Sequence, residues 1–366
     1  MNKKEIIVNK EKRNYGIDLL RVFSMFLIIN LHSLLHGGVL NNLNINTLQY
    51  NVMWLIEIFA YCAVDIFALI TGYVYYSDEK KKFKYSNYIK LWFEVVFYNL
   101  LITILFIIIN KQTFNLKIIL NCFFPIVKNS YWYFTSYTGL FFLIPVLNAG
   151  IRNIENNKLK KYFIVLFLLF SVFDTIFKRF NLINGYTVIW LSLLYILGAI
   201  IKKCNIGKDL KQYQALMIIF LLGLITFAFF KYGFETDLIK KDILISYTSP
   251  TILGMAIIYL ISASKIKFNN IFKKSIKFIS SSAFAIYLIN DSFLIRENYI
   301  KNSFVGLVNQ STIKSVFYLL AFAIVFLILS VLIDKIRILI FKLLRIDKLS
   351  EKIENIINLI FSKIVK

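Results

Sequence analysis

The sequence predicts an all-α, polytopic integral membrane protein with about ten transmembrane helices and with both termini in the cytoplasm. Three observations favour this fold class: an unusually apolar composition, a succession of long apolar segments, and an uneven distribution of Lys and Arg between the connections. Of the 366 residues, 58% are hydrophobic and 17% are charged. Soluble domains contain about 45–50% apolar residues, so this composition indicates a lipid environment.

Ten apolar segments supply the predicted helices. A bilayer core about 30 Å thick needs about 20 residues of apolar helix to cross it. The fourth, fifth and sixth segments are short, so a chain with eight or nine spans remains an alternative. The predicted spans cover residues 16–36, 52–76, 90–110, 133–149, 162–177, 186–201, 213–230, 244–263, 277–295 and 315–335.

The distribution of the 43 Lys and Arg residues tests this topology. With ten spans and the N-terminus inside, the cytoplasmic connections hold roughly three times as many of them as the outer connections, as the positive-inside rule expects. Removing one span would place much of this excess on the wrong side. The net charge of +23 is therefore mainly a topology signal. Nucleic-acid binding is not predicted, because no soluble segment is long enough to carry a basic face.

The C-terminal segment 346–366 has a different pattern from the ten spans. Its apolar residues recur at helical spacing between charged ones, which predicts a cytoplasmic amphipathic tail along the inner membrane surface. Residues 1–345 then form one membrane domain. The apolar positions of the tail are Leu349, Ile353, Ile356, Ile357, Ile360 and Ile364.

Motifs of soluble enzymes are missing from the sequence. It contains no GxSxG, Walker loop, HExxH or CxxC motif. The three cysteines, Cys62, Cys122 and Cys204, are too few and too scattered for a disulfide framework or a zinc site. No metal site is predicted.

The first apolar segment, GIDLLRVFSMFLIINLHSLLH, carries Asp18, Arg21, His32 and His36, and the chain has only two histidines. Ionisable residues inside a membrane are expensive and usually face a protein interior or a watery cavity. Arg21 and His32 are eleven residues apart, which places them within about 20° of one helix face and about 16 Å apart along the axis. The four residues therefore form one polar stripe.

Each residue of the stripe also has a purely structural interpretation. Arg21 can snorkel to the inner headgroups while Asp18 pairs with it across one turn. His36, at the outer boundary, needs no special explanation. His32 lies deeper, where an imidazole can exchange a proton near neutral pH or act as a nucleophile, so we expect it to be functional.

Further polar residues lie in later segments. Asp65, near the middle of the second segment, needs a cationic or hydrogen-bonding partner. Orienting an imidazole and pairing with an arginine are two ways to meet this need. Towards the outer end of the ninth segment, Asn290, Asp291 and Arg296 either line a binding cleft or mark a helix end that meets water. Trp132 begins an aromatic-rich stretch, SYWYFTSYTGLFF, that an interfacial belt largely explains.

Together these motifs resemble the acyltransferase-3 family of integral membrane acyltransferases, over roughly residues 13–345. Arg21 and His32 stand at the positions of an Arg-x10-His signature, and VDIFALITGY, with Asp65, is similar to a VDLFFxLSGF element. WYFTSYTGLFFLIPVLN, which begins with Trp132, is similar to a third family segment, and two later stretches follow in the family's order.

The resemblance implies transfer of an acyl group, usually acetyl from cytoplasmic acetyl-CoA, to a hydroxyl of an extracytoplasmic or lipid-linked glycan. His32 is then the essential imidazole, as a general base or as a transient acyl carrier. Arg21 acts in donor binding or holds the inner part of the path, and Asp65 completes the predicted catalytic set. The predicted substrate-binding residues are Asp18, Trp132, Asn290, Asp291 and Arg296.

One position departs from the family pattern. Many relatives read YLIH in the ninth segment, whereas this chain has Asn290 at the last position. If that histidine takes part in acceptor chemistry in the relatives, this protein works without it or uses a different acceptor. The resemblance and a bias towards Phe, Ile, Lys and Asn also lead us to expect a bacterial plasma membrane; the acceptor, the acyl group and the oligomeric state stay open.

A second function belongs to another class. A transporter or export component for a lipid-linked sugar would also place polar residues inside the membrane, with the stripe as a conduit and no acyl group on His32. The two differ in a simple property, because a transporter neither consumes acetyl-CoA nor leaves base-labile esters on its glycan.

Overall fold

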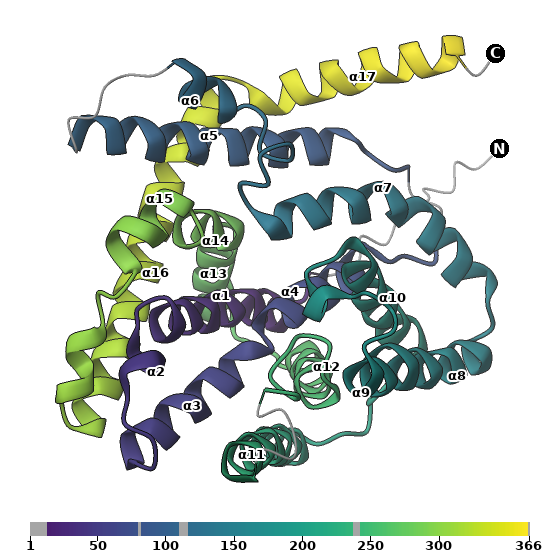
Figure 1. Cartoon of the computed structure of the whole chain (residues 1–366). Helices are drawn as coiled ribbons and strands as arrows, with labels where there is room; N and C mark the ends of the chain where they lie inside the picture. The colour runs from purple at the N-terminus through teal and green to yellow at the C-terminus, as the bar shows by residue number, and fades with distance from the viewer. Residues whose placement is uncertain (1–12, 80–81, 110–115, 237–241, 365–366) are drawn as a thin grey trace.

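The computed structural model describes residues 13–79, 82–109, 116–236 and 242–364. Every regular element within these ranges is a helix (Figure 1), so the all-α prediction is confirmed. Residues 1–12 of the predicted cytoplasmic N-terminus and residue 110 of the third predicted span lie outside the described ranges.

The longer helices follow the predicted segments in order. They are α1 (Tyr15–Leu35), α3 (Leu48–Tyr61), α4 (Ala63–Tyr75), α5 (Ser86–Ile109), α7 (Trp132–Asn153), α8 (Asn156–Phe167), α10 (Val188–Cys204), α11 (Gln212–Thr236), α12 (Pro250–Ser264), α13 (Asn270–Ser280), α14 (Ala283–Asn290), α16 (Thr312–Leu343) and α17 (Ile346–Ile364).

Short helical pieces join them. These are α2 (Val39–Asn42), α6 (Leu116–Asn121), the π-helical η1 (Leu168–Phe173), α9 (Asp174–Phe177), the 3₁₀ turn η2 (Ile183–Gly185), α15 (Phe293–Ile295), the π-helical η3 (Arg296–Ile300) and the 3₁₀ turn η4 (Val305–Asn309).

Six helical stretches of the described chain are long and apolar enough to cross a membrane, or seven if one bent pair is counted as a single span. The bent pair joins Asn270–Asn290 to Phe293–Asn309 at an angle of 57°. Helix α12 is apolar but shorter than these six stretches. Helix α8 is also short, and the π-helical η1 joins it to α9. A multi-pass membrane protein is therefore supported, whereas ten spans with cytoplasmic termini stay a prediction.

Several boundaries differ from the predicted ones. The eighth segment was expected from residue 244, but α12 begins at Pro250, because the hydroxyl of Ser249 accepts a hydrogen bond from the Ile252 N–H and starts the helix there. The second segment divides into α3 and α4 at Cys62. The tenth is longer than expected, since α16 continues to Leu343.

Helices α1, α4, α10 and α12 pack together near the centre of the molecule (Figure 1). Two glycines bring α4 and α10 into close contact: a Cβ on Gly72 would lie 2.0 Å from the Tyr195 carbonyl oxygen, and one on Gly198 would lie 2.1 Å from that of Leu69. Small residues permit such backbone approach between membrane helices. This close contact sets the orientation of α4 against α10 and so determines which residues of α4 face α1.

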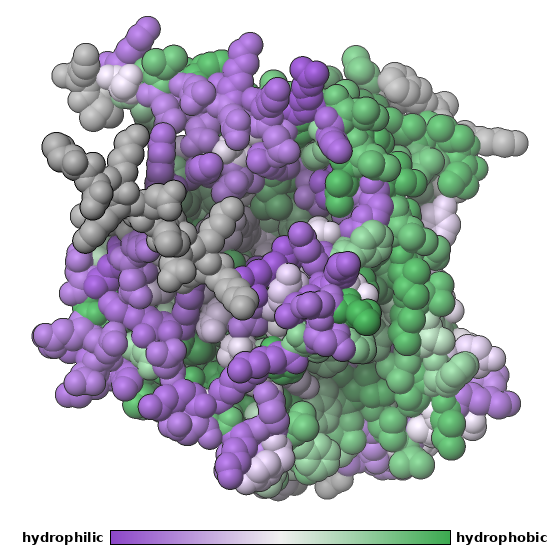
Figure 2. All heavy atoms as spheres, turned by 180° about the vertical axis from the view of Figure 1, so that it is seen from behind, coloured by the Kyte–Doolittle hydropathy of each residue, from purple (hydrophilic) through white to green (hydrophobic). Residues whose placement is uncertain are grey.

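The outer surface carries a large apolar region. Figure 2 shows this region along one side of the molecule, beside a strongly hydrophilic one. An exposed apolar area of this extent suits a lipid-facing surface. On α16 the exposed apolar residues include Phe317, Ile324, Ile328, Leu332, Ile336 and Leu339.

Helix α17 lies beside α5 (Figure 1). Glu354 accepts hydrogen bonds from the backbone N–H groups of Tyr85 and Ser86, at 3.0 and 3.2 Å, and Asp347 pairs with Lys90 at 2.6 Å. The helical character of residues 346–364 agrees with the amphipathic pattern. Its position on a membrane surface stays a prediction.

Candidate functional site

The centre of the candidate site is the imidazole of His32, in the last turn of α1. Its Nδ1 lies 2.6 Å from Oδ1 of Asn290, the last residue of α14. Asn290 is fully buried, whereas the His32 ring keeps some accessible surface. The buried side-chain amide of Asn290, at the end of α14, therefore contacts one side of the His32 ring, while part of the ring remains accessible.

This contact decides which ring nitrogen can act as a base. An amide oxygen only accepts hydrogen bonds, so Nδ1 of His32 carries the proton and donates it to Asn290. The lone pair of a neutral imidazole is then on Nε2. The ring is held in the tautomer in which Nε2 can take a proton from a substrate.

A small apolar pocket of about 30 Å³ adjoins His32. Helix α1 contributes Met25, Ile28 and Leu31, and α4 contributes Val64 and Phe67; four aromatic residues complete the wall. A volume of this order holds one water molecule or a very small apolar group. The four aromatic residues are Trp132, Tyr133, Tyr247 and Tyr287.

The second histidine lies beside the first. The ring centroids of His32 and His36 are 5.1 Å apart and the rings meet edge to face. The backbone carbonyl of His36 accepts a hydrogen bond from Asn302 at 3.0 Å. The predicted proximity of the two imidazoles, one turn apart, is therefore present in the structure.

The inner part of the stripe forms an ion cluster at the start of α1. Asp18 is buried and pairs with Arg21 at 3.3 Å and with Arg13 at 2.5 Å. These three side chains line a cavity of about 440 Å³ that Tyr73 of α4 and Lys202 of α10 also line. The pair predicted across one turn is present, and Arg13 is a second partner that the sequence analysis did not identify.

Arg21 and His32 both face α4. Arg21 shares its cavity with Tyr73 and Val74, and His32 shares its pocket with Val64 and Phe67. Because α4 runs alongside α1, the common face predicted from the eleven-residue spacing is observed. Apolar side chains separate the two polar groups, so the stripe is not a continuous polar path.

Asp65 has a hydrogen-bonding partner, as predicted, but this partner is neither an imidazole nor an arginine. Its Oδ1 accepts a hydrogen bond from the indole Nε1 of Trp190 at 3.0 Å, and the residue is fully buried. Within the described part of the chain it pairs with neither an imidazole nor an arginine. The residue that contacts the His32 ring is Asn290, for which the sequence offers a place in a binding cleft or at a helix end but not this contact.

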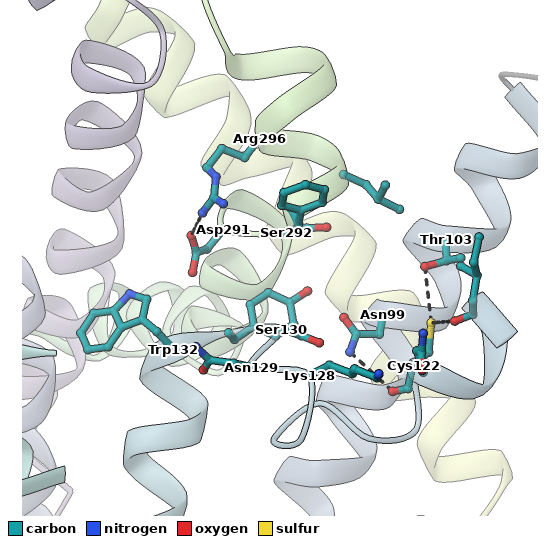
Figure 3. A pocket seen from close by; sticks show the side chains of 15 residues that line it. Asn99, Thr103, Cys122, Lys128, Asn129, Ser130, Trp132, Asp291, Ser292 and Arg296 are labelled. Carbon is teal, nitrogen blue, oxygen red and sulfur yellow. Dashed lines mark hydrogen bonds and ion pairs between the residues drawn. The ribbon is translucent and has the colours of Figure 1, made fainter. Parts of the chain in front are cut away.

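The outer predicted residues line a separate cavity of about 520 Å³. Asp291 and Arg296 form an ion pair at 3.2 Å on its wall, as Figure 3 shows. Lys128, Asn129 and Ser130 come from the loop before α7. Pockets of about 300–1,000 Å³ with a few polar groups are typical small-molecule sites.

Trp132 joins the outer cavity to the His32 pocket, because its side chain lines both. Its ring also packs against Tyr186, with centroids 4.4 Å apart. The structure therefore brings Trp132, Asn290, Asp291 and Arg296 together near His32. Asp18 lies instead at the inner cavity with Arg21.

Several residues of the site were missed by the sequence analysis. Tyr133, Tyr247 and Tyr287 line the His32 pocket, and Lys128 lines the outer cavity. No local pattern could have selected three of 22 tyrosines, because two helices and a turn that are far apart in the sequence bring them together.

The fold and site describe a helical membrane protein with an oriented imidazole between an inner and an outer cavity. The acyltransferase domain of the acyltransferase-3 family matches residues 14–335. The chain therefore belongs to this family of membrane acyltransferases. No curated protein and no solved structure matches the sequence closely enough to add a more specific activity.

Proposed function

We propose that this protein is an O-acyltransferase that moves an acetyl group from cytoplasmic acetyl-CoA to a hydroxyl of an extracytoplasmic or lipid-linked polysaccharide. The observation that carries the proposal is the hydrogen bond between His32 Nδ1 and Asn290 Oδ1, which leaves Nε2 available beside a small pocket. The family assignment supports acyl transfer; the donor, the acceptor and the role of His32 are what the family resemblance implies, and the geometry of the site is compatible with them.

The proposed step uses His32 as a general base. Nε2 takes the proton of the acceptor hydroxyl as its oxygen attacks the thioester carbonyl carbon. The new C–O bond forms, the C–S bond breaks, and the leaving thiolate receives the proton from the imidazolium. General-base catalysis of this kind contributes roughly 10²–10⁴-fold in rate.

The inner cavity suits the donor. Arg13, Arg21 and Lys202 give it cationic groups at the end of α1 that the charge distribution predicts to be cytoplasmic. From there an extended pantetheine arm would have to cover about 16 Å along α1 to reach His32. The apolar side chains between the two groups, Met25 and Ile28 among them, suit an acyl thioester better than a charged species.

The outer cavity suits the acceptor. Its lining offers amide, hydroxyl and charged groups, and Trp132 connects it to His32. A polar sugar unit can form several hydrogen bonds there, as binding sites for polar ligands require. The small volume beside His32 favours acetyl over longer acyl groups.

The proposal places the protein in a bacterial plasma membrane, with ten spans and cytoplasmic termini. Donor and acceptor then reach His32 from opposite sides.

The test measures ester content of the surface glycan by proton NMR before and after mild base. Wild-type cells are compared with a deletion and with His32→Ala expressed at a matched level. We expect both altered strains to lose the ester while the amount of glycan holds. Persistent esters with less surface glycan would reject acyl transfer and favour the sugar-export function.

A second measurement separates the two chemical roles of His32. Purified protein is incubated with acetyl-CoA labelled in the acetyl group, without acceptor, and then denatured. A general base leaves the protein unlabelled, whereas an acyl-imidazole intermediate leaves label that depends on His32.

A further inference from the structure

A second basic cavity adjoins the inner one. It measures about 470 Å³ and lies between the start of α1, the segment 264–268 and the first turn of α13. Four of its nine lining residues are cations and none is acidic. The cations are Arg13, Lys265, Lys267 and Lys273.

The position of Lys265 is fixed by the backbone. Its Nζ donates to the carbonyl oxygens of Gly207 and Leu210, at 2.5 and 2.6 Å. Carbonyl groups are dipoles and leave the ammonium with its full charge. Among the described residues, Lys265 has no carboxylate partner.

Two other cations gather around one aromatic ring. The Arg13 guanidinium and the Lys273 ammonium lie 5.9 and 6.0 Å from the Tyr15 ring centroid. Lys273 also donates to Asn270 at 3.2 Å. Arg13 also pairs with Asp18, whereas Lys265, Lys267 and Lys273 have no acidic residue beside them in the lining of this cavity. Like charges that converge in this way repel one another, and a bound anion reduces the repulsion.

The cavity is continuous with the proposed donor entrance, because Arg13 and Asn14 line both cavities. The positive-inside rule explains why lysines lie at this end of the molecule. It does not explain why they converge on a concave site that opens beside Arg21.

We propose that this basic cavity binds phosphate groups, and that in the cell it holds the phosphorylated nucleotide end of the acyl donor. The inference rests on the proposed function and specifies how the donor is recognised. The 3′-phosphate of the nucleotide contacts Lys267 and Lys273, and the acyl end passes Arg21 towards His32. Acyl-CoA is then a much better donor than acyl-dephospho-CoA or acyl-pantetheine.

The same phosphate chemistry occurs in anionic lipid headgroups, so the experiment has two arms. In the first, CoA and dephospho-CoA are titrated by calorimetry into the full-length protein in nanodiscs of phosphatidylcholine. In the second, the discs contain phosphatidylglycerol, and the thermal midpoint is compared with that in phosphatidylcholine.

The test variant is Lys267→Gln combined with Lys273→Gln. Lys265 is left intact, because its bonds to two carbonyls make it a structural residue. Lys158→Gln is the matched control: an exposed lysine near the start of α8 that pairs with Glu155 at 3.7 Å. We expect CoA binding to weaken about tenfold in the double variant, with dephospho-CoA binding changed much less and the control unaffected.

The outcomes distinguish this inference from the proposed function. Wild-type protein that fails to bind CoA in either disc would reject the donor and the proposed function with it. Normal CoA binding by the double variant would overturn the inference alone. Normal CoA binding with loss of the phosphatidylglycerol-dependent shift would assign the cavity to a lipid headgroup.

Discussion

His32 and Asn290 are 258 positions apart in the sequence, yet Nδ1 of one lies 2.6 Å from Oδ1 of the other. The amide does not titrate, so it holds the ring in the same way at any physiological pH. The position at which the sequence analysis expects a departure from the family pattern is therefore the direct neighbour of the proposed base. Under the proposed function, Asn290 therefore acts as a positioning residue.

The first prediction concerns removal of this amide. In Asn290→Ala the ring loses the group that fixes its tautomer and orientation. A hydrogen bond of this kind contributes about 1 kcal/mol or more, so we expect acyl transfer to slow at least about fivefold with a nearly unchanged KM for acetyl-CoA. Initial rates with labelled acetyl-CoA in membrane vesicles measure this effect.

The pH profile separates positioning from a merely structural role. A carboxylate in Asn290→Asp favours the protonated imidazole, which cannot act as a base, so the acidic limb of the rate profile should move to higher pH. Asn298→Ala is the control, because Asn298 is exposed and donates only to the Leu294 carbonyl, at 2.9 Å. An Asn290→Ala enzyme with the wild-type rate would contradict the assigned role.

The second prediction concerns the size of the acyl group. Val64 lines the small pocket beside His32, so Val64→Ala should enlarge it and raise the rate with propionyl-CoA relative to acetyl-CoA by severalfold. One methylene in an apolar pocket changes selectivity by roughly 10–200-fold at most. The ratio of kcat/KM for the two donors is the measurement.

A matched control for Val64 is Val146→Ala on α7, where the side chain is 70% exposed. Its donor ratio should stay at the wild-type value. An unchanged ratio in Val64→Ala would show that the acyl group does not occupy this pocket.

The sequence predicted the parts of the site that lie on one helix. Asp18, Arg21, His32 and His36 share α1, and 3.6-residue periodicity alone places them correctly relative to one another. The partner of His32 could not be predicted in this way, because Asn290 reaches it through the packing of α14 against α1. The same limit applies to Asp65, whose partner Trp190 comes from α10.

The sequence analysis misplaced a helix boundary where an apolar segment does not form helical backbone hydrogen bonds. Residues 244–249 are apolar enough to extend α12, yet they form turns. Ser171 and Thr175 donate to the buried carbonyl of Thr248, at 2.7 and 3.4 Å. Hydropathy reports transfer into lipid and carries no information on such side-chain partners, which permit irregular backbone inside protein.

The third prediction concerns a buried ion cluster between α5 and α16. Arg337 contacts Asp334 at 2.7 Å and Glu94 at 3.3 Å, and Tyr98 donates to Asp334 at 2.9 Å. Arg337→Met leaves two buried carboxylates without their cation, which typically destabilises by about 3–5 kcal/mol. We expect a clearly lower thermal midpoint in detergent.

Two further variants make this prediction specific. Lys342→Met removes an exposed cation from the same helix and should leave the midpoint almost unchanged. Adding Glu94→Gln and Asp334→Asn to Arg337→Met removes the uncompensated charges and should recover much of the loss. A midpoint that stays at the wild-type value in Arg337→Met would show that the cluster does not stabilise the fold.

The fourth prediction concerns the docking of α17 and its dependence on pH. Burial alone would raise the pKa of Glu354, but hydrogen bonds from Ser86 and Tyr85 favour the carboxylate and hold the pKa below its usual value. A lowered pKa in the docked state means that the contact is complete at neutral pH and is lost as pH falls through that value.

A spin label on Ser362→Cys reports the mobility of α17, since Ser362 is exposed and the three native cysteines are buried. We expect Glu354→Gln at pH 7 to show the mobile spectrum that the otherwise wild-type protein acquires only in acid. Gln lacks the negative charge that the N–H groups of Tyr85 and Ser86, at the start of α5, stabilise. Glu351→Gln, an exposed neighbour on the same helix, should keep the immobile spectrum at pH 7. Equal mobility of the Glu354→Gln and Glu351→Gln proteins would mean that the apolar contacts of α17, and not this carboxylate, hold the tail against α5.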